Sequence, residues 1–459
     1  MTDDASLKAN ARAALLDHVA ETALGNIPAQ AWNKARVFLL DTIGVGLAGS
    51  TAAGADDLVQ SATSWGAGDV PILGRTLKVP KPTAALLNGF FIHNLEWDAV
   101  HEPAVVHAMS VITAACLAEA AANPSISGKD FTAAVILGVD IASGLGVAAA
   151  SGLRFFRPAN AGTLGAALAV ARLRGLPRAL FDDVFGLAYS QLSGTMQAHV
   201  EGSITLPLQV AVGARSAITA VDMAEAGLTA PHDVLDGPFG YFKLIEDGGS
   251  AQSVADRLGT CWATSELSHK PYPSGRASHA VLEFVLRQRA EHGFAIEDVE
   301  RIEAKVPPLI HRLVARPYKS DMTPAYARLC LPYLCGLAAR DGHITPAAGD
   351  AENMTDGQLS EFAQRVSIDL NGNEDPNAMS PQACTIVLRS GKVIGEPIPH
   401  IYGSPDYPLT QEAAHAKFDL AVQFSHTALS QSAAEQLKSD LCAIDSLESV
   451  AELFTAWTT

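Results

Sequence analysis

The sequence has few charged and few aromatic residues, which make up 18% and 6% of its 459 residues. The charges are mainly acidic, with a formal net charge of −17 at pH 7, and no block of lysine and arginine is present. A chain with this balance repels nucleic acid and anionic membrane surfaces. We therefore expect neither nucleic acid nor a membrane among its partners.

Cysteine is also scarce. None of the six cysteines forms a CxxC pair or a Cys/His pair at zinc spacing, and most lie in apolar segments, as reduced core cysteines do. The N-terminus lacks the basic segment and apolar core of a signal peptide, so we predict a cytoplasmic protein. The apolar run from Phe131 to Leu153 is interrupted by Asp140, which favours a buried helix over a membrane span.

Several chemical signatures are missing as well. No GxGxxG follows a predicted strand, and neither a P-loop nor a GxSxG nucleophile elbow occurs. His101-Glu102 does not extend to HExxH, because the next histidine comes six residues after the first. The sequence thus gives no sign of these nucleotide-binding, serine hydrolase or zinc protease motifs, and we expect no metal site.

The patterns that are present divide the chain. Residues 1–265 show helical patterns separated by glycine and proline, residues 266–408 add strand patterns, and residues 409–459 return to helix. The expected strands are Val299–Val306, Val366–Leu370 and Ala383–Ile398, the last with a hairpin turn at Ser390-Gly391. We predict a mostly α fold, with a large all-helical domain on which the C-terminal segment packs back, and a smaller α+β domain.

The stretch from Pro82 to Ala122 organises the chain. Its spacing predicts a helix from Pro82 to near His101, because Pro103 disfavours helix before it, and a second helix from about His107 to Ala122. Acids and histidines gather at the expected corner: His93, Glu96, Asp98, His101, Glu102 and His107. Such groups are costly to bury unless they are paired or used. Both a satisfied polar corner and an active-site wall fit this pattern, and the second is favoured.

Three further segments carry candidate site residues. Ser268–His279 places Lys270, Tyr272, Arg276 and two histidines in a proline-rich loop, which suits either a binding loop or a domain linker. Arg157 precedes a small-residue helix whose N-terminus suits an anion. A later loop carries His199.

Five segments in order resemble the MmgE/PrpD family, which includes 2-methylcitrate dehydratase, cis-aconitate decarboxylase and iminodisuccinate epimerase. They are LLDTIGVGLAG at Leu39–Gly49, AALLNGFFIHNLEWDAVHE at Ala84–Glu102, HKPYPSGRASH at His269–His279, RLCLPYLCGLA at Arg328–Ala338 and GSPDYPLTQEAAHAKF at Gly403–Phe418. The resemblance implies that the α+β domain is a lid over a site between the domains, in a homodimer without a metal or organic cofactor.

The resemblance also implies a lyase or isomerase of small carboxylic acids, which removes a proton beside a carboxylate or carbonyl. Glu96, Asp98, His107, Lys270 and Tyr333 match the family's site positions. Dehydratase-type elimination is the favoured reaction, and epimerisation and decarboxylation stay open.

The chain departs from the family pattern in places. Arg157 stands where a catalytic histidine is expected, and Leu206 stands where a lysine contacts substrate. Val100 replaces a polar residue of the signature. We therefore expect a substrate with fewer carboxylates, or a more apolar arm, than 2-methylcitrate or cis-aconitate. These losses also keep open a non-catalytic binding protein.

The expected mechanism follows from charge. His107, near a helix N-terminus, is predicted to be the neutral base, and Tyr333 the proton donor. Asp98 is predicted to orient a histidine, with His101 as a partner on the same helical face. Cations are expected to hold the substrate's anionic groups. The residues predicted for substrate binding, beside the catalytic His107, Lys270, Asp98 and Tyr333, are Glu96, His101, Arg157, Tyr272, Arg276, His199 and Leu206.

Overall fold

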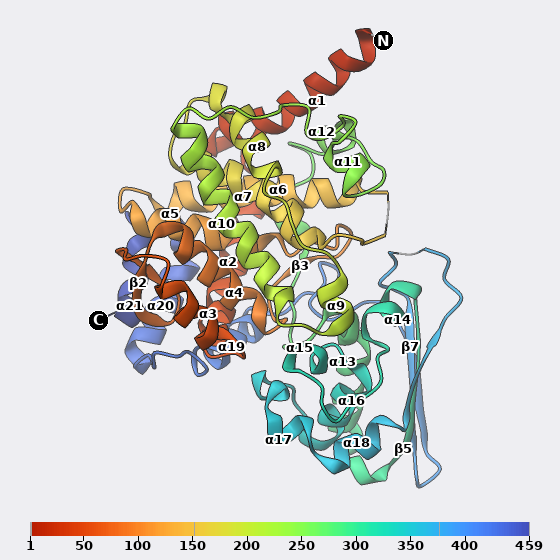
Figure 1. Cartoon of the computed structure of the whole chain (residues 1–459). Coiled ribbons are helices and arrows are strands. Elements are labelled where there is room, and N and C mark those ends of the chain that lie inside the picture. The colour runs from red at the N-terminus through yellow and green to blue at the C-terminus, as the bar shows by residue number, and fades with distance from the viewer. Residues whose placement is uncertain (1, 151, 376, 459) are drawn as a thin grey trace.

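The computed structural model describes residues 2–150, 152–375 and 377–458. Residues 1, 151, 376 and 459, which the predicted domains include, lie outside the described residues. The chain folds into two units (Figure 1), and each is built around a large hydrophobic core. The first joins residues 11–267 to residues 418–457, and the second is built from residues 277–401.

Helices make up most of the first unit. They are α1 (Thr2–Glu21), α2 (Ala29–Gly49), α3 (Ala55–Thr63), α4 (Lys81–Asn94), α5 (Ala108–Ala122), α6 (Gly128–Ala148), α7 (Arg157–Leu173), α8 (Phe181–Tyr189), α9 (Gln197–Glu201), α10 (Thr205–Glu225), α11 (Tyr241–Leu244), α12 (Ala251–Ala255), α19 (Gln411–Val422), α20 (Gln431–Cys442) and α21 (Thr455–Thr458). The short strands beside them are β1 (Val70–Ile72), β2 (Arg75–Val79), β3 (Val100–His101) and β4 (Leu267–Ser268).

The second unit packs helices on a four-stranded sheet. Its helices are α13 (His279–His292), α14 (Pro308–Val314), α15 (Pro324–Ala327), α16 (Leu331–Asp341), α17 (Ala351–Met354) and α18 (Gly357–Ala363). Its strands are β5 (Val299–Val306), β6 (Val366–Leu370), β7 (Gln382–Leu388) and β8 (Val393–Ile398). Short 3-10 helices along the chain span Leu24–Asn26, Arg178–Leu180, Ala263–Glu266, Arg276–Ser278, Ile296–Asp298, Pro346–Gly349, Ile444–Ser446 and Val450–Phe454.

The sheet has the order β6-β5-β7-β8, with β5 parallel to β6 and antiparallel to β7. The predicted strands at 299–306 and 366–370 and the hairpin at Ser390-Gly391 are confirmed. Gly391 has a φ of 85°, which a residue without Cβ adopts at little cost. The mostly α fold with a smaller α+β domain is confirmed as well.

Small residues let the central helices approach closely. A Cβ at Gly138 in α6 would lie 2.9 Å from the carbonyl oxygen of Gly165 in α7, and a Cβ at Gly165 would lie 2.4 Å from that of Gly138. By length and composition α6 is able to cross a membrane, but 89% of its most apolar window is buried inside the fold. It therefore forms the core of the large unit, as predicted for this apolar run.

The helix of the organising stretch ends earlier than predicted. α4 stops at Asn94, because Leu95 caps it and Glu96 turns the chain with a left-handed φ of 53°. The chain then forms β3, which pairs with β4. The prediction that helix continues to His101 is wrong, since Pro103 marks a turn that follows the strand rather than the helix end.

The C-terminal segment holds this turn from behind. Lys417 in α19 is buried and lies 2.5 Å from Asp41 in α2. It also donates a hydrogen bond of 2.8 Å to the carbonyl of Trp97, between Glu96 and Asp98. The C-terminal helix thus fixes the loop that carries both acids.

We predict that Lys417→Met lowers the free energy of unfolding by about 3–5 kcal/mol, because Asp41 is left as an unpaired buried carboxylate. Denaturant unfolding measures the change. Lys438→Met is the matched control, since its pair with Asp419 is partly exposed and worth at most about 1 kcal/mol. Adding Asp41→Asn to Lys417→Met should recover part of the loss. Equal effects of the two lysine substitutions would contradict the role of the buried pair.

Candidate active site

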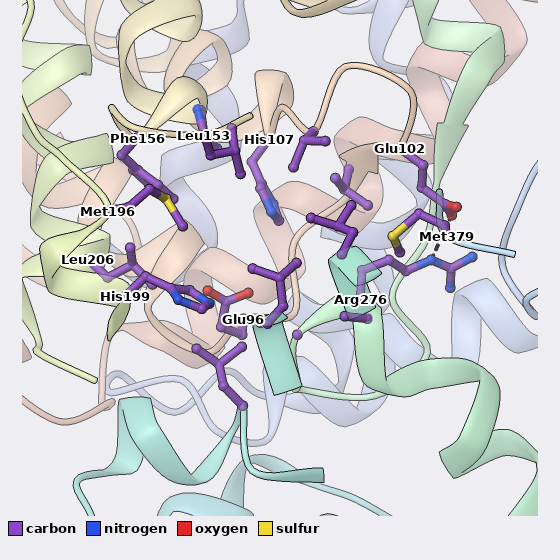
Figure 2. A pocket seen from close by; sticks show the side chains of 18 residues that line it. Glu96, Glu102, His107, Leu153, Phe156, Met196, His199, Leu206, Arg276 and Met379 are labelled. Carbon is purple, nitrogen blue, oxygen red and sulfur yellow. Dashed lines mark hydrogen bonds and ion pairs between the residues drawn. The ribbon is translucent and has the colours of Figure 1, made fainter. Parts of the chain in front are cut away.

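A pocket lies between the two units, and Figure 2 shows its lining. Its polar lining consists of Glu96, Glu102, His107, His199 and Arg276. The rest is mainly apolar: Val100, Val105, Leu153, Phe156, Pro158, Met196, Leu206, Ala277, Leu309, Leu313, Leu329 and Met379. A small organic molecule with an apolar portion fits such a lining.

The wall of this pocket carries backbone strain. Glu96 and Val105 both line it, and both have left-handed backbones, with φ of 53° and 52°. This conformation is uncommon for residues with a Cβ and is an outlier for a β-branched residue such as Val105. It costs about 1–3 kcal/mol and gathers at functional sites, which supports an active site here.

Asp98 lies behind the pocket and is fully buried. Its Oδ2 atom accepts hydrogen bonds from Nδ1 of His93 at 2.9 Å, from Nδ1 of His107 at 3.0 Å, and from the Ser110 hydroxyl. Burial by itself would raise the pKa of Asp98, but His107, His93 and Lys270 hold that pKa well below its usual range. Asp98 is therefore a carboxylate that fixes two imidazole rings.

A second ion pair adjoins this carboxylate. Nζ of the fully buried Lys270 lies 2.8 Å from Oε2 of Glu96 and 3.7 Å from Oδ1 of Asp98. Burial opposes ionisation of Glu96, but Lys270 and His93 lower its pKa to about 2. For His93, burial disfavours the charged form, yet Asp98 and Glu96 raise its pKa above the ordinary value. The Lys270 ammonium and the raised pKa of His93 thus favour positive charge beside the two carboxylates.

This balance leaves His107 neutral. It is the residue before α5, and its side chain is 12% exposed at the pocket (Figure 2). Burial lowers the pKa of His107, the Asp98 carboxylate opposes this, and Lys270 lowers it further. With the hydrogen of Nδ1 donated to Asp98, Nε2 carries a lone pair, and it has no hydrogen-bond partner among the described residues. His107 is therefore arranged as a base.

His199 of α9 lines the same pocket in the opposite tautomer. Nη2 of Arg316 lies 3.4 Å from its Nδ1. Because a guanidinium only donates, Nδ1 accepts and Nε2 carries the hydrogen. Burial, with Arg316 next in effect, lowers the pKa of His199 to about 4. A neutral imidazole with a free N–H can donate to an oxyanion, as a neutral histidine does in other enolising enzymes.

Two predicted site residues prove to be structural. Arg157 is buried and forms a two-pronged ion pair with Glu246, with both distances 2.8 Å, and also donates to the carbonyl of Ala104. Tyr333 is buried in the second core and donates its hydroxyl hydrogen to Ala348 at 2.8 Å. Other protein groups engage both side chains and neither residue lines the pocket, so this geometry gives no support to substrate binding by Arg157 or to proton donation by Tyr333.

Two further predictions fail for related reasons. His101 lies on β3, where its Nε2 bonds to Glu266 at 2.9 Å and its Nδ1 accepts from Ala104. It is therefore not the partner of Asp98, because the expected helical face does not exist there. Tyr272 packs on the second core, with its ring 5.4 Å from that of His279, and is absent from the pocket lining.

The remaining predictions have mixed outcomes. His107, Glu96, His199 and Leu206 line the pocket together. Lys270 does not line it, so it acts as the counter-ion of Glu96 rather than as a clamp on the substrate.

Arg276 lines the pocket, but its donors are engaged. They bond to Glu102 at 2.7 Å and to the carbonyls of His269, Ile401 and Tyr402. It therefore brings positive charge to the wall but no free fork for a carboxylate.

Two members of the network were not among the predicted site residues. His93 and Ser110 both bond to Asp98 from the helices that flank it, α4 and α5. His93 stands in the predicted polar corner, five residues before Asp98, so the sequence indicates that the two are near each other. The sequence does not predict the turn at Glu96, which points the side chains of His93 and Asp98 towards each other.

The network also has the composition of a metal site. His93, Asp98 and His107 each place one ligand atom within 4.8 Å of the others. However, both Nδ1 atoms bond to the same carboxylate oxygen, and the Lys270 ammonium lies 3.7 Å from the other one. An ammonium at that distance repels a metal cation. We therefore interpret the cluster as a hydrogen-bonded base.

Comparisons with known proteins match both parts of the chain. The sequence profile of the MmgE/PrpD N-terminal domain matches residues 13–253, and that of the MmgE/PrpD C-terminal domain matches residues 272–442. The chain is 25% identical to the cis-aconitate decarboxylases of Mus musculus and Homo sapiens. These alignments cover 84% and 86% of the chain, and 81% and 84% of the relatives.

A third relative is matched over a shorter stretch. The chain is 26% identical to the cis-aconitate decarboxylase-like protein oryM of Aspergillus oryzae, over 65% of the chain and 66% of that protein.

The pKa of His199 predicts a pH dependence of stability. The folded state holds His199 neutral down to about pH 4, whereas the unfolded chain protonates it near pH 6.5. Unfolding therefore takes up a proton between these values, and this histidine lowers the free energy of unfolding by up to about 3 kcal/mol as pH falls through them. In His199→Gln, the part of the decrease in the free energy of unfolding that comes from His199 should be absent between pH 6.5 and 4. Denaturant unfolding across the window measures it.

The exposed His343, whose recorded hydrogen-bond partner is a backbone carbonyl, supplies the control. His343→Gln should leave the contribution of His199 to the pH dependence in place. Parallel curves for wild type and His199→Gln would contradict a neutral, buried His199.

Proposed function

The chain belongs to the MmgE/PrpD family, and on this premise we propose that it is a lyase of small carboxylic acids that removes a proton α to a carboxylate or carbonyl. Dehydratase-type elimination is the reaction that the site supports best. The observation that carries the proposal is the neutral His107, which Asp98 holds with its Nε2 lone pair at the pocket.

The first step is transfer of the α-proton to Nε2 of His107. The imidazolium that forms is stabilised by Asp98, to which its Nδ1–H is already bonded. Proton transfer by a positioned group contributes typically about 10²–10⁴-fold in rate. The enolate oxygen that develops accepts a hydrogen bond from Nε2–H of His199, and the charge of Arg276 at the wall adds to its stabilisation.

Elimination completes the reaction without a further reagent. The bond between the β-carbon and its hydroxyl oxygen breaks as the carbon–carbon double bond forms. The leaving hydroxide takes the proton from His107 and departs as water, which returns the imidazole to its neutral form. The same histidine thus acts first as base and then as acid.

The pocket favours a substrate with an apolar portion. Leu206 lines it where the family has a lysine, and the one cation in its described lining, Arg276, is engaged by Glu102 and three carbonyls. A buried carboxylate without a cation costs several kcal/mol. This lining supports the expectation that tricarboxylates such as cis-aconitate are poor substrates.

Decarboxylation is the second candidate. The observation that favours it is the similarity to relatives that are named cis-aconitate decarboxylases. In that reaction the carbanion left by carbon dioxide would take a proton from His107, and the neutral imidazole would first have to gain that proton from solvent. The two candidates are separated by their products, because only elimination releases water and retains every carbon.

We predict that the protein exchanges the C2 proton of a 3-hydroxy acid for deuterium in heavy water and forms the unsaturated acid. Proton NMR follows both changes on 3-hydroxybutanoate, 3-hydroxyhexanoate and 3-hydroxyadipate. His107→Ala should lose about 10²–10⁴-fold in the exchange rate, because the base is gone. The melting temperature of the same variant is measured alongside.

His101→Asn is the control. His101 is a buried histidine of the same segment that does not line the pocket, so this variant should lose stability but keep its exchange rate per folded molecule. Exchange by His107→Ala at the wild-type rate would remove the base from the mechanism. Absence of exchange by the wild type on all three acids, with carbon dioxide released from cis-aconitate, would favour the decarboxylase.

A further inference from the structure

A second pocket adjoins the first and is lined by cations. It shares Leu153, Met196, His199 and Leu313 with the first pocket, so the two pockets adjoin at these residues. Beyond them it is lined by Arg312 at the end of α14 and by Arg316 and Lys319 in the following loop. We call this cluster of three cations, with the pocket it lines, the vestibule.

Acidic residues are absent from the described lining of the vestibule. This is unusual for a chain with a net charge of −17, in which many other arginines pair with carboxylates. Among the described residues, none of the three vestibule cations has a carboxylate within the 4.0 Å of an ion pair. Three like charges on one short segment repel one another. An anion bound among them would relieve this repulsion.

Arg316 is the cation placed best for this role. Its Nη2 bonds to the carbonyls of His199 and Leu313 at 3.2 and 3.3 Å, which fixes the guanidinium. Its Nη1 is buried and has no hydrogen-bond partner. The Cζ atom of Arg316 lies 4.7 Å from the centre of the Tyr326 ring. Nζ of Lys319 lies 4.9 Å from the centre of the same ring. A fixed fork with an unused donor is the geometry that binds a carboxylate or phosphate.

The contact between Arg316 and His199 links the vestibule to the chemistry. His199 lines both pockets, with its Nδ1 towards Arg316. The apolar residues Leu153, Met196 and Leu313 also line both pockets, so they lie between the side that holds Arg316 and the side that holds His107.

From this shared lining we propose that the vestibule binds the distal anionic group, a carboxylate or a phosphate, of an elongated substrate. The apolar middle of that substrate lies along Leu153, Met196 and Leu313, and its reacting carbon lies at His107. The position of the reacting carbon rests on the proposed function. The anion site itself rests only on the three cations and the shared lining.

In this arrangement the anionic group and the reacting carbon of the substrate are bound in different places, whereas in a tricarboxylate they lie close together. The anionic charge is recognised in the vestibule, where cations are available, and the reacting end enters a pocket whose lining is mostly apolar. This division accounts for the leucine at position 206, because a lysine there would serve an anion next to the reacting carbon rather than at a distance from it.

The test uses unreactive probes and isothermal titration calorimetry on the full chain. Octanoate and octyl phosphate carry an anion on an apolar chain, and octanamide is the neutral isostere. We expect octanoate or octyl phosphate to bind at least tenfold more tightly than octanamide, because a charge-assisted hydrogen bond is lost in the amide. The tighter of the two anions identifies the source of the charge.

Variants test whether the preference for an anion over the neutral amide arises in the vestibule. Arg316→Gln should remove most of the difference between anion and amide. The double variant Arg312→Ala/Lys319→Ala changes exposed residues only, so it keeps the test informative if Arg316→Gln does not fold, and it should weaken anion binding by about threefold or more. Arg301→Ala is the matched control, since it removes one exposed arginine from β5 of the same unit, outside both pockets.

Three results would overturn the vestibule: equal binding of octanoate, octyl phosphate and octanamide, an anion preference that survives the vestibule variants, or an equal loss in Arg301→Ala. Proton exchange on a 3-hydroxy acid together with equal binding of the probes would leave the proposed function standing. Anion-specific binding without exchange would overturn the proposed function alone.

Discussion

One carboxylate oxygen, Oδ2 of Asp98, determines the state of the site, because two imidazoles and a hydroxyl donate to it at once. A buried carboxylate that accepts three hydrogen bonds is stabilised by positive charge nearby, which the Lys270 ammonium supplies and the raised pKa of His93 favours. With the charge of Asp98 and Glu96 balanced, His107 is left neutral and correctly oriented. Removing any one of these charges would alter the protonation of the others, so the network behaves as a unit.

The fold is arranged to bring this network together from distant segments. α4 and α5 flank Asp98, the loop before α13 supplies Lys270, and α19 returns from the C-terminal part of the chain to place Lys417 on the carbonyl of Trp97. Trp97 in turn donates to the carbonyl of Pro271, next to Lys270. The strained turn at Glu96 is thus held from both sides. This explains why a C-terminal segment packs on the helical unit although the α+β unit precedes it in sequence.

Much of this arrangement was predictable where it depends on local patterns. The strands of the second unit, the helical unit and the polar corner with Asp98 and His107 all followed from periodicity and from the cost of burying charge. The failures concern partners that lie far away in sequence. The sequence suggests that Arg157 binds an anion, but in the structure it pairs with Glu246, 89 residues later. The sequence suggests that Tyr333 donates a proton, but its hydroxyl donates to the carbonyl of Ala348. His101 was misplaced because one left-handed residue, Glu96, ended the helix early.

The central claim is that Asp98 holds His107 as a neutral imidazole with its hydrogen on Nδ1. Nitrogen-15 NMR of histidine-labelled protein distinguishes the two neutral tautomers and the imidazolium, and the His107→Gln variant assigns the signal. At pH 7 we expect a protonated Nδ1 and an unprotonated Nε2 in the resting protein. An imidazolium at His107, or a neutral ring with its hydrogen on Nε2, would contradict the account, because neither form has a lone pair at the pocket to accept the proton.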